Sequence, residues 1–241
     1  MLNKDYKKIS QRLTTWIKER VQKAGCKGAV VGLSGGIDSA VTSVLSKRAF
    51  PDNTLGIIMP CYSNPQDAED AKEIAKKFDI PYQIVDLSTT FDQLRETIGI
   101  EDTDNLAVAN IKPRLRMTTL YYYASQQSSL VVGTDNRSEL KLGYFTKYGD
   151  GGIDIAPLGN LVKSEVREVA KELGIPKRII TKAPSAGLWE DQTDEDELGI
   201  TYEEIDRYIL TGEAKPKVKK IVDKLAAKNK HKLQLPPIPK F

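Results

Sequence analysis

GAVVGLSGGIDS, residues 28–39, is the stretch of sequence that decides the fold of this chain. Its first six residues form an apolar run of strand length, which ends at Ser34, Gly35 and Gly36. Apolar residues then recur at helical spacing over residues 37–48, and a second strand-like run follows at 54–59. Strand, glycine turn, helix and strand in this order predict a βαβ unit with parallel strands and a right-handed crossover.

The same alternation continues along the chain. We predict further strands at 81–87 and 130–133, and helices at 6–21, 64–78, 105–127 and 162–173. Asn64 followed by Pro65 is a typical helix start, and Gly25 and Gly174 are typical helix ends. The expected fold class is α/β, with a doubly wound, mainly parallel sheet of the Rossmann-like type and helices on both faces.

The composition excludes several classes of protein. The 241 residues carry a formal net charge of +3, with 40% hydrophobic and 29% charged residues, which is typical of a globular chain. This charge is too small to indicate nucleic acid binding. Cys26 and Cys61 are too few for a disulfide scaffold or a four-ligand zinc site, and no apolar run reaches the roughly 18–20 residues of a membrane span. We expect a cytoplasmic protein without a membrane or nucleic acid partner, and the N-terminus lacks the apolar region of a signal peptide.

Charge is distributed unevenly near the end of the chain. Residues 190–206 include nine acidic and no basic residues, whereas residues 215–241 include nine lysines and one acid. We expect residues 1–241 to form a single domain, with 183–241 as its mostly helical or irregular C-terminal extension. The charged stretches indicate either a solvated helix with a trailing arm or a segment that a ligand or partner subunit orders.

The glycine loop after the first strand has the composition of a phosphate site. Gly35 and Gly36 let the backbone approach a phosphate, and the following helix presents free amides and a positive dipole end to it. Asp38 would repel a phosphate unless a cation lies between them, so it indicates Mg²⁺. The alternative is a plain tight turn with Asp38 near a helix start.

SGGIDS (residues 34–39) resembles the pyrophosphate loop of the ATP pyrophosphatases, which cleave ATP between the α- and β-phosphates. Other stretches resemble ammonia-dependent NAD synthetases within that superfamily. They are NIKPRLRM (110–117), VVGTD (131–135) leading to Glu139, GYFTKYGDGGID (143–154), Pro157-Leu158 with Lys163, KAPSA (182–186) and His231-Lys232. They occur in the family's order over nearly the whole chain.

This resemblance implies a set of site residues. ATP would be bound by Gly32, Leu33, Ser34, Gly35, Gly36, Ile37, Asp38, Ser39, Thr134, Lys163 and Ser185. Deamido-NAD would be bound by Arg114, Lys147, Asp154, His231 and Lys232. Asp38 and Glu139 would bind Mg²⁺, and Asp38 and Lys163 would be the catalytic residues. Considered singly, these residues are ordinary surface charges and turn hydroxyls.

The chain departs from the family pattern beside Glu139. Asn136-Arg137-Ser138 replaces a small-residue stretch with a leading histidine, and Ser185 stands where threonine is frequent. The hydroxyl survives at Ser185, whereas the first change makes the surroundings of Glu139 more basic.

The resemblance implies ATP-dependent amidation of deamido-NAD with free ammonia, giving NAD, AMP and pyrophosphate through an adenylated carboxylate. It also implies a homodimer. A glutaminase domain has no room before the first strand, so we expect the chain to use free ammonia, or ammonia from a separate partner protein. The alternatives are another ATP pyrophosphatase, such as a tRNA-modifying enzyme, and a non-catalytic nucleotide-binding regulator. We further expect residues 149–154 and 183–196 to behave as lids.

Overall fold

A parallel sheet with the strand order β3-β2-β1-β4 lies at the centre of the fold. The strands are β1 (Gly28–Gly32), β2 (Thr54–Ile58), β3 (Tyr82–Ile84) and β4 (Ser129–Val131). In the register, Ala29 of β1 pairs with Thr54 on one side and Leu130 on the other. The structure, a computed structural model, describes residues 4–101, 105–185, 187 and 193–239.

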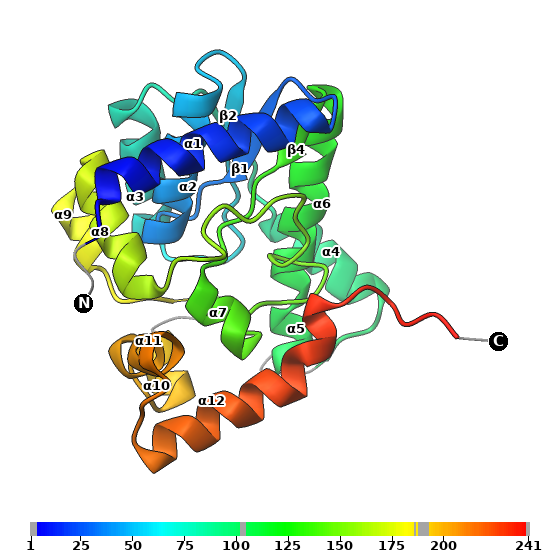
Figure 1. The fold of residues 1–241 in the computed structure, drawn as a ribbon. Helices are drawn as coiled ribbons and strands as arrows, with labels where there is room; N and C mark the ends of the chain where they lie inside the picture. The colour runs from blue at the N-terminus through cyan, green and yellow to red at the C-terminus, as the bar shows by residue number, and fades with distance from the viewer. Residues whose placement is uncertain (1–3, 102–104, 186, 188–192, 240–241) are drawn as a thin grey trace.

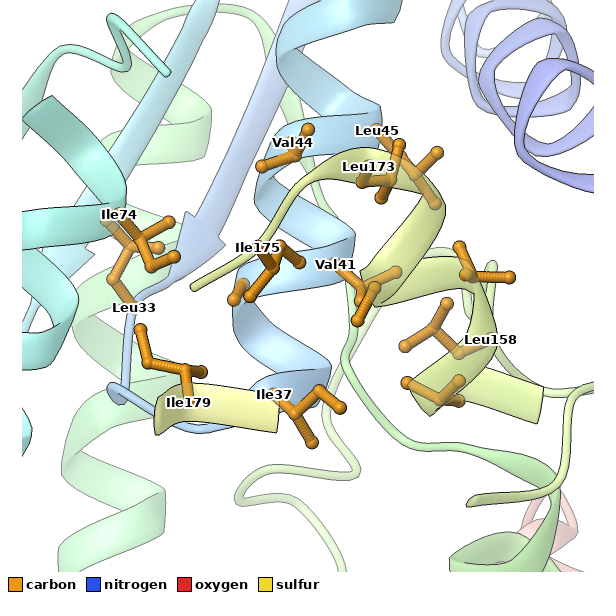
Figure 2. Close-up of a cluster of buried hydrophobic side chains, with 14 of the residues drawn as sticks. Leu33, Ile37, Val41, Val44, Leu45, Ile74, Leu158, Leu173, Ile175 and Ile179 are labelled. Carbon is orange, nitrogen blue, oxygen red and sulfur yellow. The ribbon is translucent and has the colours of Figure 1, made fainter. Parts of the chain in front are cut away.

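Helices cover both faces of this sheet (Figure 1). Side chains from α1 (Tyr6–Lys23), α2 (Ile37–Ala49), α3 (Pro65–Lys77), α8 (Lys163–Leu173) and α9 (Lys177–Thr181) share one hydrophobic cluster. Figure 2 shows part of it, with Ile37, Val41 and Val44 of α2 between Ile179 and Leu173. A second cluster joins Val30 of β1 to α4 (Ser88–Thr97), α5 (Leu106–Ala109) and α6 (Ile111–Gln126). The predicted doubly wound α/β fold is confirmed.

The predicted elements differ from the structure in their bounds. The helix expected at 105–127 is two helices, α5 and α6, which meet at Asn110. The strand expected at 81–87 spans only Tyr82–Ile84, and the one expected at 130–133 is Ser129–Val131, followed by a single bridge from Val132 to Ile155. Sequence reasoning also missed α4, α7 (Arg137–Leu142) and α9. In α4 only Phe91 is buried, and the other two are too short to show helical periodicity.

The C-terminal helices gather beside α7, away from α1 (Figure 1). They are α10 (Asp194–Leu198), α11 (Tyr202–Thr211), α12 (Pro216–Asn229) and the 3₁₀ turn η1 (Lys230–Leu233). A separate hydrophobic cluster holds them to α7 through Leu142, Tyr202 and Val222. Thr201 and Glu204 form a capping box that starts α11, and left-handed Gly212 ends it. Residues 194–233 therefore fold against the rest of the chain, whereas residues 234–239 trail from it as exposed chain.

None of the described helices is both long and apolar enough to cross a membrane.

Candidate active site

The loop between β1 and α2 can take only glycine at one position. Gly35 has a φ of +80°, and a Cβ atom there would lie 2.2 Å from the carbonyl oxygen of Asp67. Gly36 is the N-cap of α2 and makes no side-chain cap bond, so no cap side chain closes the first turn of this 13-residue helix. The amides and the positive dipole end of α2 are therefore available to an anion.

Two serines brace this loop from inside. The hydroxyls of Ser34 and Ser39 lie 3.0 Å apart, and Ser39 Oγ donates to the carbonyl of Gly36 at 3.0 Å. The amide of Ser34 donates to Ser39 Oγ at 3.2 Å, and the amide of Gly36 donates to Ser34 Oγ at 3.3 Å. Ser39 is buried and Ser34 is exposed, so Ser34 is the hydroxyl that a phosphate can reach directly.

The structure brings Asp38, Glu139 and Lys163 together. Lys163 Nζ lies 2.6 Å from Asp38 Oδ2 and 3.0 Å from Glu139 Oε1. The three side chains come from the first turns of α2, α7 and α8, and their exposed fractions are 16%, 13% and 3% in residue order. α2 follows β1 and α7 follows β4, and these neighbouring parallel strands end at the same edge of the sheet.

Burial strengthens the electrostatics of this cluster. Burial of the Lys163 ammonium opposes its charge, but Asp38 and Glu139 outweigh this effect and raise the pKa of Lys163. Burial raises the pKa of the Glu139 carboxyl, Lys163 opposes that rise, and Asp38 adds to it. The ring of Tyr202 from α11 lies beneath the ammonium, with Nζ 4.9 Å from the ring centre. Lys163 is thus held as a cation at a nearly dry position.

Asn136 is a buried contact of this cluster that sequence reasoning did not assign. Its Nδ2 donates to Asp38 Oδ1 at 3.0 Å, and its Oδ1 accepts from the amides of Ser138 and Glu139. Glu139 returns the contact by accepting from the Asn136 amide at 3.0 Å, which completes a capping box. A cap residue three positions before a glutamate is a recognisable signal, so the capping half of this arrangement was readable from the sequence.

Asp206 of α11 also reaches the site, with no signal in the sequence. It is 3% exposed and accepts from Ser138 Oγ at 2.6 Å and from the Ser164 amide at 2.7 Å. Ser138 Oγ in turn accepts from the Lys163 amide at 3.2 Å. One carboxylate therefore joins the starts of α7 and α8, which carry Glu139 and Lys163.

Asp135 adds a third buried acid next to the pair. It is 5% exposed, and among the described residues its Oδ2 has no hydrogen-bond partner. Burial raises the pKa of Asp135 well above its usual value, and the carboxylates of Asp150, Glu139 and Asp38 add to the rise. Asp135 lies four residues after the end of β4, on the side of the sheet where an open α/β fold places ligand contacts.

Four of the five predicted dinucleotide residues lie together. Lys147 Nζ donates to the carbonyl of His231 at 2.9 Å, and Arg114 Nη2 lies 3.5 Å from the carbonyl of Lys147. Lys232 Nζ donates to the carbonyls of Gly143 and Phe145 at 2.8 and 2.7 Å, and burial lowers its pKa. The contacts of Lys232 anchor η1 to the 143–147 segment, so its ammonium has a structural partner in this structure.

Asp154 is bound elsewhere, at the end of β4. Its Oδ2 accepts from the Val131 amide at 2.8 Å, and its Oδ1 accepts from the Tyr121 hydroxyl at 3.0 Å. Its side chain is exposed, so lone pairs remain for a substrate hydroxyl. Among the described residues, no hydrogen bond or ion pair joins Asp154 to the Arg114–Lys147 group, and its bond to the Val131 amide supports the sheet edge.

Thr134 and Ser185, two further predicted ATP residues, come from two other segments of the chain, whereas Leu33 and Ile37 are buried in the hydrophobic cluster around α2. Thr134 is half-buried just after β4. Ser185 accepts from the Gly187 amide at 3.0 Å, and Lys182 ties its segment to α3 through Asp67 at 2.6 Å and Asp70 at 2.7 Å. Of the lid expected at 183–196, residues 186 and 188–192 lie outside the described residues. In the lid expected at 149–154, Asp150 Oδ1 accepts from the Thr146 amide at 2.9 Å.

Comparison with known proteins identifies the family. A sequence model described as NAD synthase matches residues 9–236. The chain is 50% identical over 238 residues to an NH₃-dependent NAD⁺ synthetase of Carboxydothermus hydrogenoformans, with 98% of both chains covered. Among solved structures it resembles an NMN synthetase from Francisella tularensis, with a TM-score of 0.94, 39% identity and 99% and 100% coverage. It also resembles an NH₃-dependent NAD synthetase from Campylobacter jejuni, with a TM-score of 0.82, 34% identity and 98% and 100% coverage. The matching stretches, the glycine loop and the Asp38–Glu139–Lys163 cluster all agree with one conclusion: this chain belongs to the NAD synthase family.

Proposed function

We propose that this chain makes NAD by activating the nicotinate carboxylate of deamido-NAD with ATP and replacing the leaving AMP with ammonia. Ammonia-dependent NAD synthesis, a ligase reaction, is the activity that its full-length relatives share. The observation that carries the detailed proposal is the position of Asp38, Glu139 and Lys163 at the open N-terminus of α2. In this arrangement the free amides of α2, the buried Lys163 ammonium and the carboxylates of Asp38 and Glu139 lie close together.

In the first step, an oxygen of the nicotinate carboxylate attacks the α-phosphorus of ATP. A new oxygen–phosphorus bond forms, the bond to the bridging oxygen breaks, and pyrophosphate leaves with its electron pair. The α2 amides and the Ser34 hydroxyl hold the departing phosphates, and the Lys163 ammonium offsets the charge that develops on them. In the second step, ammonia attacks the acyl carbon, AMP leaves and the nitrogen loses a proton. These steps need no side-chain nucleophile.

The donor set of the site fits Mg²⁺. Asp38 and Glu139 each direct one oxygen to the Lys163 ammonium, at 2.6 and 3.0 Å. Their hard carboxylate oxygens are ligands that Mg²⁺ prefers. When both carboxyl groups are ionised, the cluster carries one net negative charge, so it attracts a further cation. Asp38 and Glu139 would hold Mg²⁺ together with phosphate oxygens, and the ion would neutralise phosphate charge.

Deamido-NAD would bind through the cations of the Arg114–Lys147 group. The dinucleotide is an anion with a pyrophosphate and a carboxylate, and Arg114 and Lys147 are suited to both. His231 and Lys232 would act from η1, which packs against the same segment. Asp154 would accept hydrogen bonds from a ribose hydroxyl.

We also propose that the chain works in the cytoplasm as a homodimer. Both cysteines are free, which suits a reducing compartment. Leu106 of α5 and Tyr122 of α6 are 59% and 58% exposed, and a second copy would cover them.

One of the similar structures suggests a second candidate substrate for this chain. The Francisella tularensis structure is described as an NMN synthetase. NMN is the amide of nicotinate mononucleotide, which is half of the dinucleotide. The two candidates are separated by measuring kcat/KM for each acid with ATP, Mg²⁺ and ammonium. We expect the higher value for deamido-NAD, and an equal or higher value for the mononucleotide would overturn this choice.

The nitrogen source and the reaction class are tested with the same assay. We expect deamido-NAD-dependent release of pyrophosphate with ammonium, and little turnover with glutamine alone. Rapid turnover on pure glutamine would contradict the use of free ammonia. Release that requires RNA would favour an RNA-modifying enzyme, and no release at all would favour a regulator.

A further inference from the structure

Asn136 lies between the two carboxylates of the proposed metal site. It is fully buried, and it is the N-cap of α7. Its Nδ2 donates to Asp38 Oδ1 at 3.0 Å, while its backbone amide donates to Glu139 Oε2 at 3.0 Å. One residue therefore contacts both acids, through two different groups.

These contacts divide the oxygens of each carboxylate. Asn136 takes Asp38 Oδ1 and Glu139 Oε2, and Lys163 takes Asp38 Oδ2 and Glu139 Oε1. Asn136 thus fixes the rotation of each carboxylate through one of its oxygens, and the other oxygen of each points to the Lys163 ammonium. Rotation of either group would remove that convergence.

Only an amide side chain supplies all of these contacts at position 136. Its Oδ1 accepts from the amides of Ser138 at 2.9 Å and Glu139 at 3.1 Å, which caps the helix. Serine and aspartate cap helices about as well as asparagine does. Neither of them carries a side-chain N–H group that reaches Asp38. Capping and donation to Asp38 can therefore be separated by substitution.

We propose that Asn136 is a positioning residue that orients Asp38 and Glu139 toward the cation of the reacting complex. This inference rests on the proposed function, in which those two carboxylates hold Mg²⁺ with ATP.

The decisive variant is Asn136→Ser, which keeps the cap and removes the donor to Asp38. We expect the Mg²⁺ concentration for half-maximal activity to rise roughly 10- to 100-fold, the range typical of groups that orient metal ligands. The KM for deamido-NAD should stay within about twofold, because the Arg114–Lys147 group is untouched. Asn136→Asp also keeps the cap but adds a carboxylate beside Asp38. We expect it to lower kcat at least as much as Asn136→Ser does.

A binding measurement supports the kinetics without turnover. Mg²⁺ is titrated calorimetrically into each protein in the presence of α,β-methylene-ATP, which cannot be cleaved at the reacting bond. We expect the same 10- to 100-fold weakening in Asn136→Ser. The matched control is Arg137→Ala, the exposed neighbouring position, which should behave as the unchanged protein in both assays.

Thermal unfolding separates positioning from stability. Loss of folded protein lowers the amplitude of activity but leaves the half-maximal Mg²⁺ concentration unchanged. If both Asn136→Ser and Asn136→Asp keep that concentration, or if neither variant folds, Asn136 acts only as a cap and the inference falls. Asp38→Asn serves as the test of the underlying assignment. If Asp38→Asn is fully active, the proposed metal site is wrong; if it is inactive while Asn136→Ser is normal, only the role of Asn136 is wrong.

Discussion

Single residues at this site have requirements that follow from a few interatomic distances. Lys163 must be long enough to place its ammonium between two carboxylates from different helices, at 2.6 and 3.0 Å. Gly35 must lack a Cβ atom, because the main chain of α3 passes 2.2 Å from where that atom would be. The glycine loop is therefore packed closely against α3.

Gly35→Ala tests this close approach. Gly35 and Gly25 both have left-handed backbones, with φ of +80° and +71°, but an added Cβ at Gly25 meets nothing within 4 Å. Gly25→Ala should therefore cost only the backbone strain, about 1–2 kcal/mol in the free energy of unfolding. Gly35→Ala should cost more and also raise the KM for ATP, as measured by urea unfolding and steady-state kinetics. Equal effects of the two variants would contradict the proposed contact with Asp67.

At the scale of elements, helices distant in sequence hold the site in place. α11 contributes Tyr202 under the Lys163 ammonium and Asp206 between the starts of α7 and α8. On the opposite side of the loop, α9 and Lys182 bind α3 through Asp70. The active site is thus supported by contacts that the reacting groups do not make themselves.

Asp206→Asn tests the link from α11. The amide group of asparagine would face the Ser164 amide or the Ser138 hydroxyl as a second donor, so one of the two hydrogen bonds is lost at a buried position. We expect the free energy of unfolding to fall by about 1–3 kcal/mol and kcat to fall with it. Asp223→Asn is the matched control, since Asp223 accepts from the Tyr208 hydroxyl at an exposed position. A control variant that loses as much stability as Asp206→Asn would contradict the link.

The Asp70 cluster predicts a pH dependence of stability. Burial would raise the pKa of Asp70, but hydrogen bonds from Lys182, Gln66 and Arg178 outweigh it and lower the pKa below its usual value. A carboxyl with a lowered folded-state pKa contributes stability above its unfolded pKa of about 3.9, and this contribution is lost as pH falls through the folded value. Because both cationic partners are partly exposed, we expect a contribution of about 1–2 kcal/mol.

Urea unfolding of Asp70→Asn across pH measures that contribution. The variant should be less stable than the unchanged protein at pH 7, and the difference should shrink below about pH 4. Glu69→Gln is a control on the same helix, because the Glu69 pair with Lys72 is solvent-screened and its loss should change stability little at any pH. A difference for Asp70→Asn that stays constant down to pH 2 would show that its charge contributes nothing.

At the scale of the whole molecule, helices cover both faces of the sheet, and the C-terminal helices lie beside α7, which follows β4 (Figure 1). The C-terminal helices α10 to α12 have their own hydrophobic cluster with α7, and η1 returns to the 143–147 segment through Lys232. The end of the chain therefore closes around the same region as the glycine loop, which lies near its beginning.

The proposed homodimer is a prediction at this scale. Sedimentation at working concentration should give twice the mass of the 241-residue chain. Leu106→Glu and Tyr122→Glu should shift the protein toward monomer, because each places a charge on the exposed apolar surface of α5 and α6. Leu210→Glu on α11, where leucine is 45% exposed, is the control and should leave the mass unchanged. A monomer in the unchanged protein would contradict the proposal.

The sequence by itself determined the α/β class, the parallel βαβ unit and the family. Each of these depends on patterns within short continuous stretches of sequence. They are the apolar periodicity over 28–33 and 37–48, the glycines between them, and Asp38 in the first turn of a helix. The resemblance also singled out Glu139 and Lys163, and the structure places both side chains beside Asp38. Helices were missed where they are short or, like α4, bury few side chains.

Only the tertiary structure decided which atoms meet. Asn136 and Asp38, Ser138 and Asp206, and Lys232 and Phe145 are pairs from separate elements, and nothing local to either partner specifies the other. Their contacts depend on how the helices pack on the sheet, which is set by many apolar side chains at once. The sequence could therefore indicate candidate site residues, but not the residues of other elements that contact them.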